Sequence, residues 1–112
     1  MSFEITLETV LIRRVPLNPN FIDVNGQVTS ACFKIKKGED GLSINIKDLV
    51  DDVNVLYNNR THTLRCFKAS IPIDSGCSCI HNPQVNNYSH GLVLGDINKI
   101  ARKLATECTV VY

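Results

Sequence analysis

Apolar and polar residues alternate along several short stretches of the chain, with the period of two that is typical of half-buried β-strands. This alternation predicts strands over residues 28–36 and 42–47, and the five residues between them suit the turn of a hairpin. It also predicts a strand over residues 67–73, where Pro72 lacks an amide donor and favours a sheet edge or a strand end. The segment Lys68–Asp74 is therefore a candidate edge for pairing with another chain.

Both ends of the chain also carry strand patterns. Residues 3–8 alternate in the same way and are followed by the apolar stretch 10–12, although a helical stripe would fit the apolar residues of this segment as well. The apolar run 90–94 predicts a short strand that stops at Gly95, and residues 109–112 predict a last strand. Between the first two predicted strands, two prolines and an Asn-Gly pair indicate a loop with a tight turn.

One helix is clearly predicted near the C-terminus, beginning after Asp96 and running from about Ile97 to Glu107. Its apolar residues recur at spacings of three and four and so form one buried stripe. Lys99, Arg102 and Lys103 would face water. The stripe consists of Ile97, Ile100, Ala101, Leu104, Ala105 and Cys108.

A shorter helix is predicted in the middle of the chain, capped by Asp48, although residues 53–57 would equally suit a strand. The apolar stripe of this middle helix would be Leu49, Val50, Val53, Leu56 and Tyr57. Together the elements predict an α+β fold in one domain, residues 1–112, with a mostly antiparallel sheet, a well-defined C-terminal helix and this short middle helix.

Composition narrows the class of protein. The chain has 112 residues, of which 44% are hydrophobic and 21% charged, so one core can form without help from disulfides or metal. No apolar run approaches the roughly 20 residues that a membrane-spanning helix needs. The first residues carry acids where a signal peptide would carry bases, which favours a cytoplasmic location without a membrane partner. The net charge of +1 is too small for the molecule as a whole to attract nucleic acid or anionic lipid.

The five cysteines are an odd number, and three of them lie among apolar neighbours, so free thiols are expected. A run near residue 80 nevertheless gathers four potential zinc ligands, Cys77, Cys79, His81 and His90. Residues two apart on a strand are separated by about 6.6 Å, whereas ligands of one zinc must lie within about 4 Å of each other. We therefore expect no cofactor and keep structural zinc as an alternative. A Cys77–Cys79 disulfide would be strained.

Several segments, in this order, resemble a family of short, largely uncharacterised bacterial cytosolic proteins. The segments are LIRRVP, FIDVNGQVTSACFK, GLSINI, IHNPQVNNYSHGLVLGD and KIARKLA, and they cover most of residues 11–105. Cys77 and Cys79 depart from the family pattern, which further weakens a shared metal function. The resemblance implies a bacterial cytosolic protein with ligand-binding candidates Arg13, Arg14, Ser30, Ser43, His81 and His90.

The chemistry of the arginine and histidine candidates is that of anion recognition. A guanidinium binds phosphate or carboxylate with two parallel hydrogen bonds, and an imidazole binds phosphate or transfers a proton. His81 and His90 flank a polar loop and are the candidate catalytic residues if there is catalysis, and we expect both to approach one arginine. Because Arg13 and Arg14 are adjacent on a predicted strand, they should point to opposite faces, and only one should serve a given pocket.

Signature motifs of known enzyme classes are absent from the sequence, which has no nucleophile elbow, phosphate loop, zinc-protease helix or dinucleotide fingerprint. The sequence therefore decides neither for nor against an enzyme. Its leading interpretation is a small binding or accessory module that acts through a protein partner. The alternative is an enzyme or sensor that acts on a phosphate-containing small molecule or nucleic acid through the arginine and histidine site, and the second alternative is structural zinc.

Overall fold

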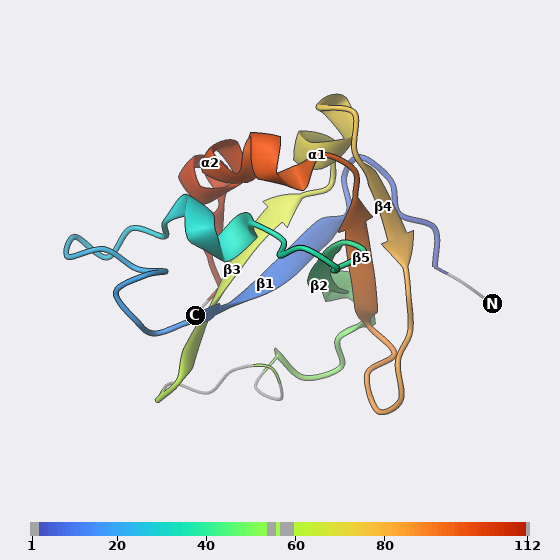
Figure 1. Ribbon diagram of the computed structural model, residues 1–112. Helices are drawn as coiled ribbons and strands as arrows, with labels where there is room; N and C mark the ends of the chain where they lie inside the picture. The colour runs from blue at the N-terminus through green and yellow to red at the C-terminus, as the bar shows by residue number, and fades with distance from the viewer. Residues whose placement is uncertain (1–2, 54–55, 57–59, 112) are drawn as a thin grey trace.

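The computed structural model describes residues 3–53, 56 and 60–111. Within these residues an antiparallel sheet is the framework of the molecule (Figure 1). Its strands run in the order β4-β5-β2-β1-β3-β6. The strand bounds are β1 Val10–Pro16, β2 Leu42–Ile46, β3 His62–Lys68, β4 Ser78–His81, β5 His90–Leu94 and β6 Thr109–Val110.

Two α-helices, α1 (Ser70–Asp74) and α2 (Ile97–Glu107), lie on the same side of the sheet (Figure 1). Two 3₁₀ turns, η1 (Ser30–Phe33) and η2 (Lys47–Leu49), complete the elements of the described chain. No helix in these described residues has the length and apolar character needed to cross a membrane. The structure thus confirms the predicted α+β class with its mostly antiparallel sheet.

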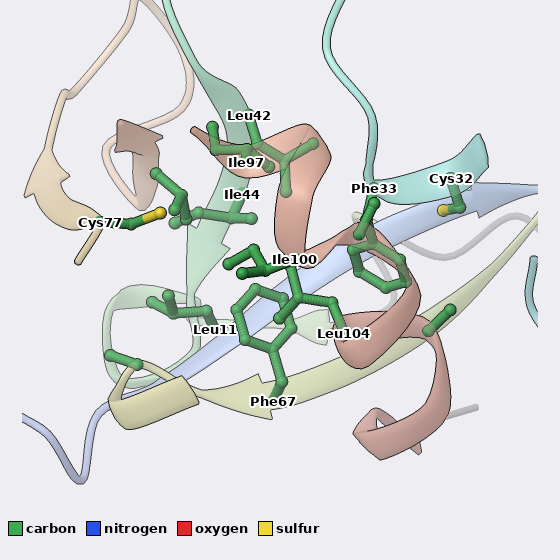
Figure 2. Packing of buried hydrophobic residues seen from close by; sticks show 14 of the residues in the cluster. Leu11, Cys32, Phe33, Leu42, Ile44, Phe67, Cys77, Ile97, Ile100 and Leu104 are labelled. Carbon is green, nitrogen blue, oxygen red and sulfur yellow. The ribbon is translucent and has the colours of Figure 1, made fainter. Parts of the chain in front are cut away.

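The main core lies between the sheet and α2 (Figure 2). The stripe of α2 predicted from the sequence contributes Ile97, Ile100 and Leu104 to this core, where they pack with Leu11, Ile44 and Phe67 of the sheet. Lys99, Arg102 and Lys103 are exposed, as predicted. Asp96 precedes the first turn, but its side chain makes no capping hydrogen bond. The predicted bounds of α2 are confirmed.

Several strand predictions are also confirmed in the structure. The apolar run 90–94 forms β5. Of the last strand, predicted over 109–112, the structure shows β6 at Thr109–Val110, which pairs with β3, and residue 112 lies outside the described residues. The strand β5 ends where Gly95 adopts a φ of +120°, and a side chain there would meet Cys77, whose Cα lies 3.3 Å from the position that a Cβ of residue 95 would occupy. The positive φ and this tight contact both favour glycine at the end of β5.

The predicted hairpin of residues 28–36 and 42–47 is wrong. Residues Ser30–Phe33 form η1, which contacts α2, and β2 pairs with β1 and β5 instead. Two consecutive side chains, Cys32 and Phe33, are both buried, whereas a strand would have sent them to opposite faces. Packing beneath α2 therefore overrides the alternating pattern.

The predicted edge strand over 67–73 is wrong as well. The strand β3 ends at Lys68, and Ser70–Asp74 forms α1 with Pro72 buried. Proline is tolerated in the first turn of a helix, where its missing amide would have had no partner, so Pro72 fits α1 as well as a strand end. The edges of the described sheet are β4 and β6.

Two further predictions are corrected in part. Residues 3–9 form no strand, and β1 begins only at Val10. The predicted middle helix is represented by the single turn η2, in which Asp48 lies inside the turn instead of capping it. Residues 54, 55 and 57 of that prediction lie outside the described residues.

Candidate anion-binding pocket

A pocket of about 230 Å³ lies beside the point where β1 and β2 part. The two strands pair only at Leu11 with Ile46 and at Ile12 with Asn45, whereas β1 pairs with β3 along its whole length. Beyond these two pairs β1 and β2 are no longer paired with each other, so their remaining residues border a gap in the sheet. The pocket is lined by Arg13, Arg14, Ser43, Asn45, Leu56, Asn87 and His90.

Arg13 bridges the gap between the two strands. Its Nε donates to the Cys32 carbonyl at 3.0 Å, and one terminal nitrogen donates to the Ser43 carbonyl at 2.7 Å. These bonds, together with a side-chain hydrogen bond to the Cys32 thiol, hold the guanidinium in place. Arg13 is thus partly a structural residue whose charge remains beside the pocket.

Arg14 offers the larger set of free donors. Its Nε donates to the Leu56 carbonyl at 3.0 Å, while both terminal nitrogens lack a hydrogen-bond partner among the described residues. Burial, and after it the charge of Arg14, lowers the pKa of His62 on β3. Both arginines line the pocket, so the expectation that only one could serve it is wrong. The gap lets Arg13 reach it although the two backbone positions face opposite sides.

Asn45 and Asn87 present amide groups to the pocket. The hydroxyl of Ser89 lies 2.9 Å from Oδ1 of each asparagine, and its one proton can be donated to only one of these oxygens at a time. The Nδ2 atoms of both asparagines have no hydrogen-bond partner among the described residues. Asn45 is only 7% exposed, so its amide is a buried donor that borders the pocket.

His90 lies directly opposite Asn45 in the ladder between β2 and β5, so the two side chains are neighbours on one face. The side chain is 6% exposed, and its Nδ1 lies 2.9 Å from the Asn82 carbonyl. A carbonyl only accepts, so Nδ1 carries a proton and Nε2 of the neutral ring is an acceptor. Nε2 has no partner among the described residues. No unpartnered side-chain nitrogen or oxygen there is fully enclosed, so Nε2 keeps some exposure to solvent, and His90 is one of the residues that line the pocket.

His81 and Ser30 lie elsewhere. His81 pairs with Gly91 in the ladder, so its side chain points to the face opposite His90. Both of its ring nitrogens are engaged, since Nδ1 accepts from the Phe3 amide at 2.8 Å and Nε2 donates to the Tyr88 carbonyl at 2.6 Å. Ser30 lines a separate hollow against Arg102 of α2. Of the six residues predicted for the site, four therefore share the pocket.

The asparagines of the pocket were missed from the sequence. Asn45 stands two residues after Ser43 in an alternating strand, and this spacing already places both side chains on one face. That signal could have identified Asn45. Asn87 comes from the connection between β4 and β5, and no local pattern indicates that it lies near Arg14.

The cysteines are all free thiols. Cys77 is buried in the core, and Cys79 is half-buried on β4. Burial raises the pKa of Cys79 to about 11, with a smaller contribution from Cys77, and burial followed by the charge of Asp96 raises the pKa of Cys77. Among the described residues no three histidine, cysteine or acidic side chains are grouped to hold a metal. We still expect far less than one zinc per chain, and elemental analysis would test this against the zinc alternative.

The raised pKa of Cys79 predicts a loss of stability in alkali. Between its ordinary value of 9.0 and about 11, the folded chain keeps the thiol proton that the unfolded chain releases. The free energy of unfolding should therefore fall as the pH rises through this window, as urea denaturation at a series of pH values would measure. Cys79→Ala should show a smaller fall, whereas Ser78→Ala, its neighbour on β4, should behave as the wild type. An equal fall in all three proteins would contradict this assignment.

Comparison of the chain with protein-family models, with curated proteins and with solved structures gave no match. The resemblance to short bacterial proteins therefore remains a prediction. Any function must be inferred from the chemistry of the pocket itself. That chemistry combines two guanidinium groups, two free amide donors and one imidazole acceptor.

Proposed function

We propose that this chain is a binding domain that recognises an anionic group, in the first place a phosphate, in the pocket beside Arg14. The observation that carries the proposal is the set of described lining residues, which includes two arginines and two asparagines but no carboxylate. Arginines usually pair with acids when they are held near one another, because like charges repel. Two guanidinium groups beside one pocket without an acid leave a positive potential that an anion would neutralise.

Phosphate suits the donors that are free. The terminal nitrogens of Arg14 can donate two parallel hydrogen bonds to two oxygens of one phosphate, and such charge-assisted bonds are among the strongest in proteins. The amides of Asn45 and Asn87 would add neutral donors from the opposite wall. Because Arg13 is already fixed by two carbonyls, its charge would be in place before a ligand arrives.

We propose binding without catalysis, because the described pocket offers few reactive groups. None of the cysteines lines the pocket within the described chain, and burial raises the pKa of Cys32, Cys77, Cys79 and Cys108, which disfavours a thiolate nucleophile. Among the described lining residues, His90 is the one group suited to proton transfer, and no hydroxyl or thiol of the described chain is bonded to its Nε2. An enzyme would need the ligand itself to bring the second reacting group.

Titration calorimetry with inorganic phosphate tests the proposal. We expect binding at one site per chain that weakens as sodium chloride is added, because the attraction is between charges. Sodium acetate provides a comparison with a singly charged anion and should bind more weakly. No measurable binding of phosphate at millimolar concentration would contradict the proposal.

A protein partner is a second candidate, in line with the leading interpretation of the sequence. The connection between β4 and β5 projects from one end of the sheet (Figure 1) and carries Val85, which is 91% exposed, and Tyr88, which is 56% exposed. Ile80 on the edge strand β4 is also exposed. Exposed apolar residues on a sheet edge favour contact with another chain. A cytosolic location remains part of this proposal.

A further inference from the structure

His90 presents an acceptor to a pocket that otherwise offers donors. The Asn82 carbonyl fixes the proton on Nδ1, so the lone pair of Nε2 remains free on a side chain that is only 6% exposed. Water can reach this atom in the free protein, but a ligand that covers it leaves it unpaired, at a cost in free energy, unless the ligand supplies a partner. A phosphate that has lost its protons supplies only acceptors and cannot be that partner.

The missing partner must therefore be a donor on the ligand. An ammonium group is disfavoured there, because Arg13 and Arg14 line the same pocket and would repel it. A neutral hydroxyl group has no such penalty and donates one hydrogen bond. The pocket volume of about 230 Å³, compared with about 30 Å³ for one water, leaves room for a short carbon chain that bears such a hydroxyl.

We infer that the ligand is a phosphate monoester of a polyol, whose phosphate contacts Arg14 and whose neighbouring hydroxyl donates to Nε2 of His90. This inference rests on the proposed function and specifies its ligand class. The direct pairing of Asn45 with His90 supports it, because a donor amide and an acceptor nitrogen then lie side by side on one face of the sheet. Leu56 supplies an apolar wall for the carbon chain.

A matched pair of ligands tests the inference. Glycerol 3-phosphate and n-propyl phosphate share the phosphate and the three-carbon chain, but only the first has hydroxyls. We expect the wild-type protein to bind glycerol 3-phosphate about fivefold to tenfold more tightly in calorimetry at neutral pH, the effect of one neutral hydrogen bond to a buried acceptor. Equal affinities for the two ligands would overturn the inference and leave the proposed phosphate site intact. Failure of both ligands to bind would overturn the inference, and the proposed function would fall with it only if inorganic phosphate did not bind either.

Two variants assign the preference to the imidazole. His90→Phe removes the acceptor, so the ratio of its affinities for glycerol 3-phosphate and n-propyl phosphate should fall to about one. His90→Gln, with an amide oxygen as acceptor, should recover part of the preference. If His90→Phe keeps the full preference, another group accepts the hydrogen bond of the hydroxyl, and the inference is wrong. Because His90 is buried, circular dichroism must first show that each variant is folded. If neither variant is folded, the comparison of the two ligands on the wild-type protein still tests the inference.

Discussion

Arg14→Gln is expected to weaken the binding of inorganic phosphate by about 10- to 100-fold. A hydrogen bond to a charged group contributes about 1.5 to 3 kcal/mol, and about 1.4 kcal/mol corresponds to a factor of ten in affinity. Glutamine keeps much of the length and a donor amide, but it removes the charge and the parallel pair of donors. Calorimetric titration of the wild type and the variant measures the ratio.

The control for this change is Arg102→Gln, which removes the same charge from the exposed surface of α2. It should bind phosphate nearly as well as the wild type does. The stability of Arg14→Gln should also change little, because Arg14 is exposed and loses only its bond to the Leu56 carbonyl. An equal loss of affinity in both variants would mean that net charge, and not this pocket, attracts phosphate.

Leu104→Ala should give the largest loss of stability, about 2 to 5 kcal/mol in the free energy of unfolding. Leu104 is 0% exposed and lies in the core between α2 and the sheet (Figure 2). Removal of its side chain would leave a cavity that the neighbouring ring of Phe67 and the other core residues could fill only in part. Urea denaturation followed by circular dichroism measures the change.

Lys103→Ala is the matched control, since it changes the neighbouring position of the same helix to the same residue. Lys103 is exposed, and alanine favours helix, so the change should cost less than about 0.5 kcal/mol. Similar losses in the two variants would show that the stripe of α2 has been assigned to the wrong face.

The sequence pattern predicted those elements in which the buried residues recur at a single regular spacing. The helix α2 has a full stripe at helical spacing and contacts the sheet with that stripe alone, so its face and its bounds are those expected from the sequence. The alternating pattern failed for residues 28–36, because Cys32 and Phe33 are both buried. It failed again after Lys68, where the chain turns into α1. In both places tertiary packing outweighs a weak local preference.

The pocket depends on features that no local pattern contains. Arg14, Ser43 and His90 come together because β2 lies between β1 and β5, and because β1 and β2 part after two paired positions. His81 was expected beside His90, but the register of β4 with β5 sends the two rings to opposite faces. The residue types were therefore predictable from their chemistry, whereas their grouping required the strand order and the register.

The most direct test of the central proposal is to locate a bound oxyanion in crystals of the protein. Crystals soaked in tungstate, a tetrahedral and electron-dense analogue of phosphate, would show its position by anomalous scattering. The predicted result is a single strong peak within hydrogen-bond distance of the terminal nitrogens of Arg14 and facing His90. An empty pocket with the peak beside Ser30 and Arg102, or with no ordered peak on the protein, would contradict it.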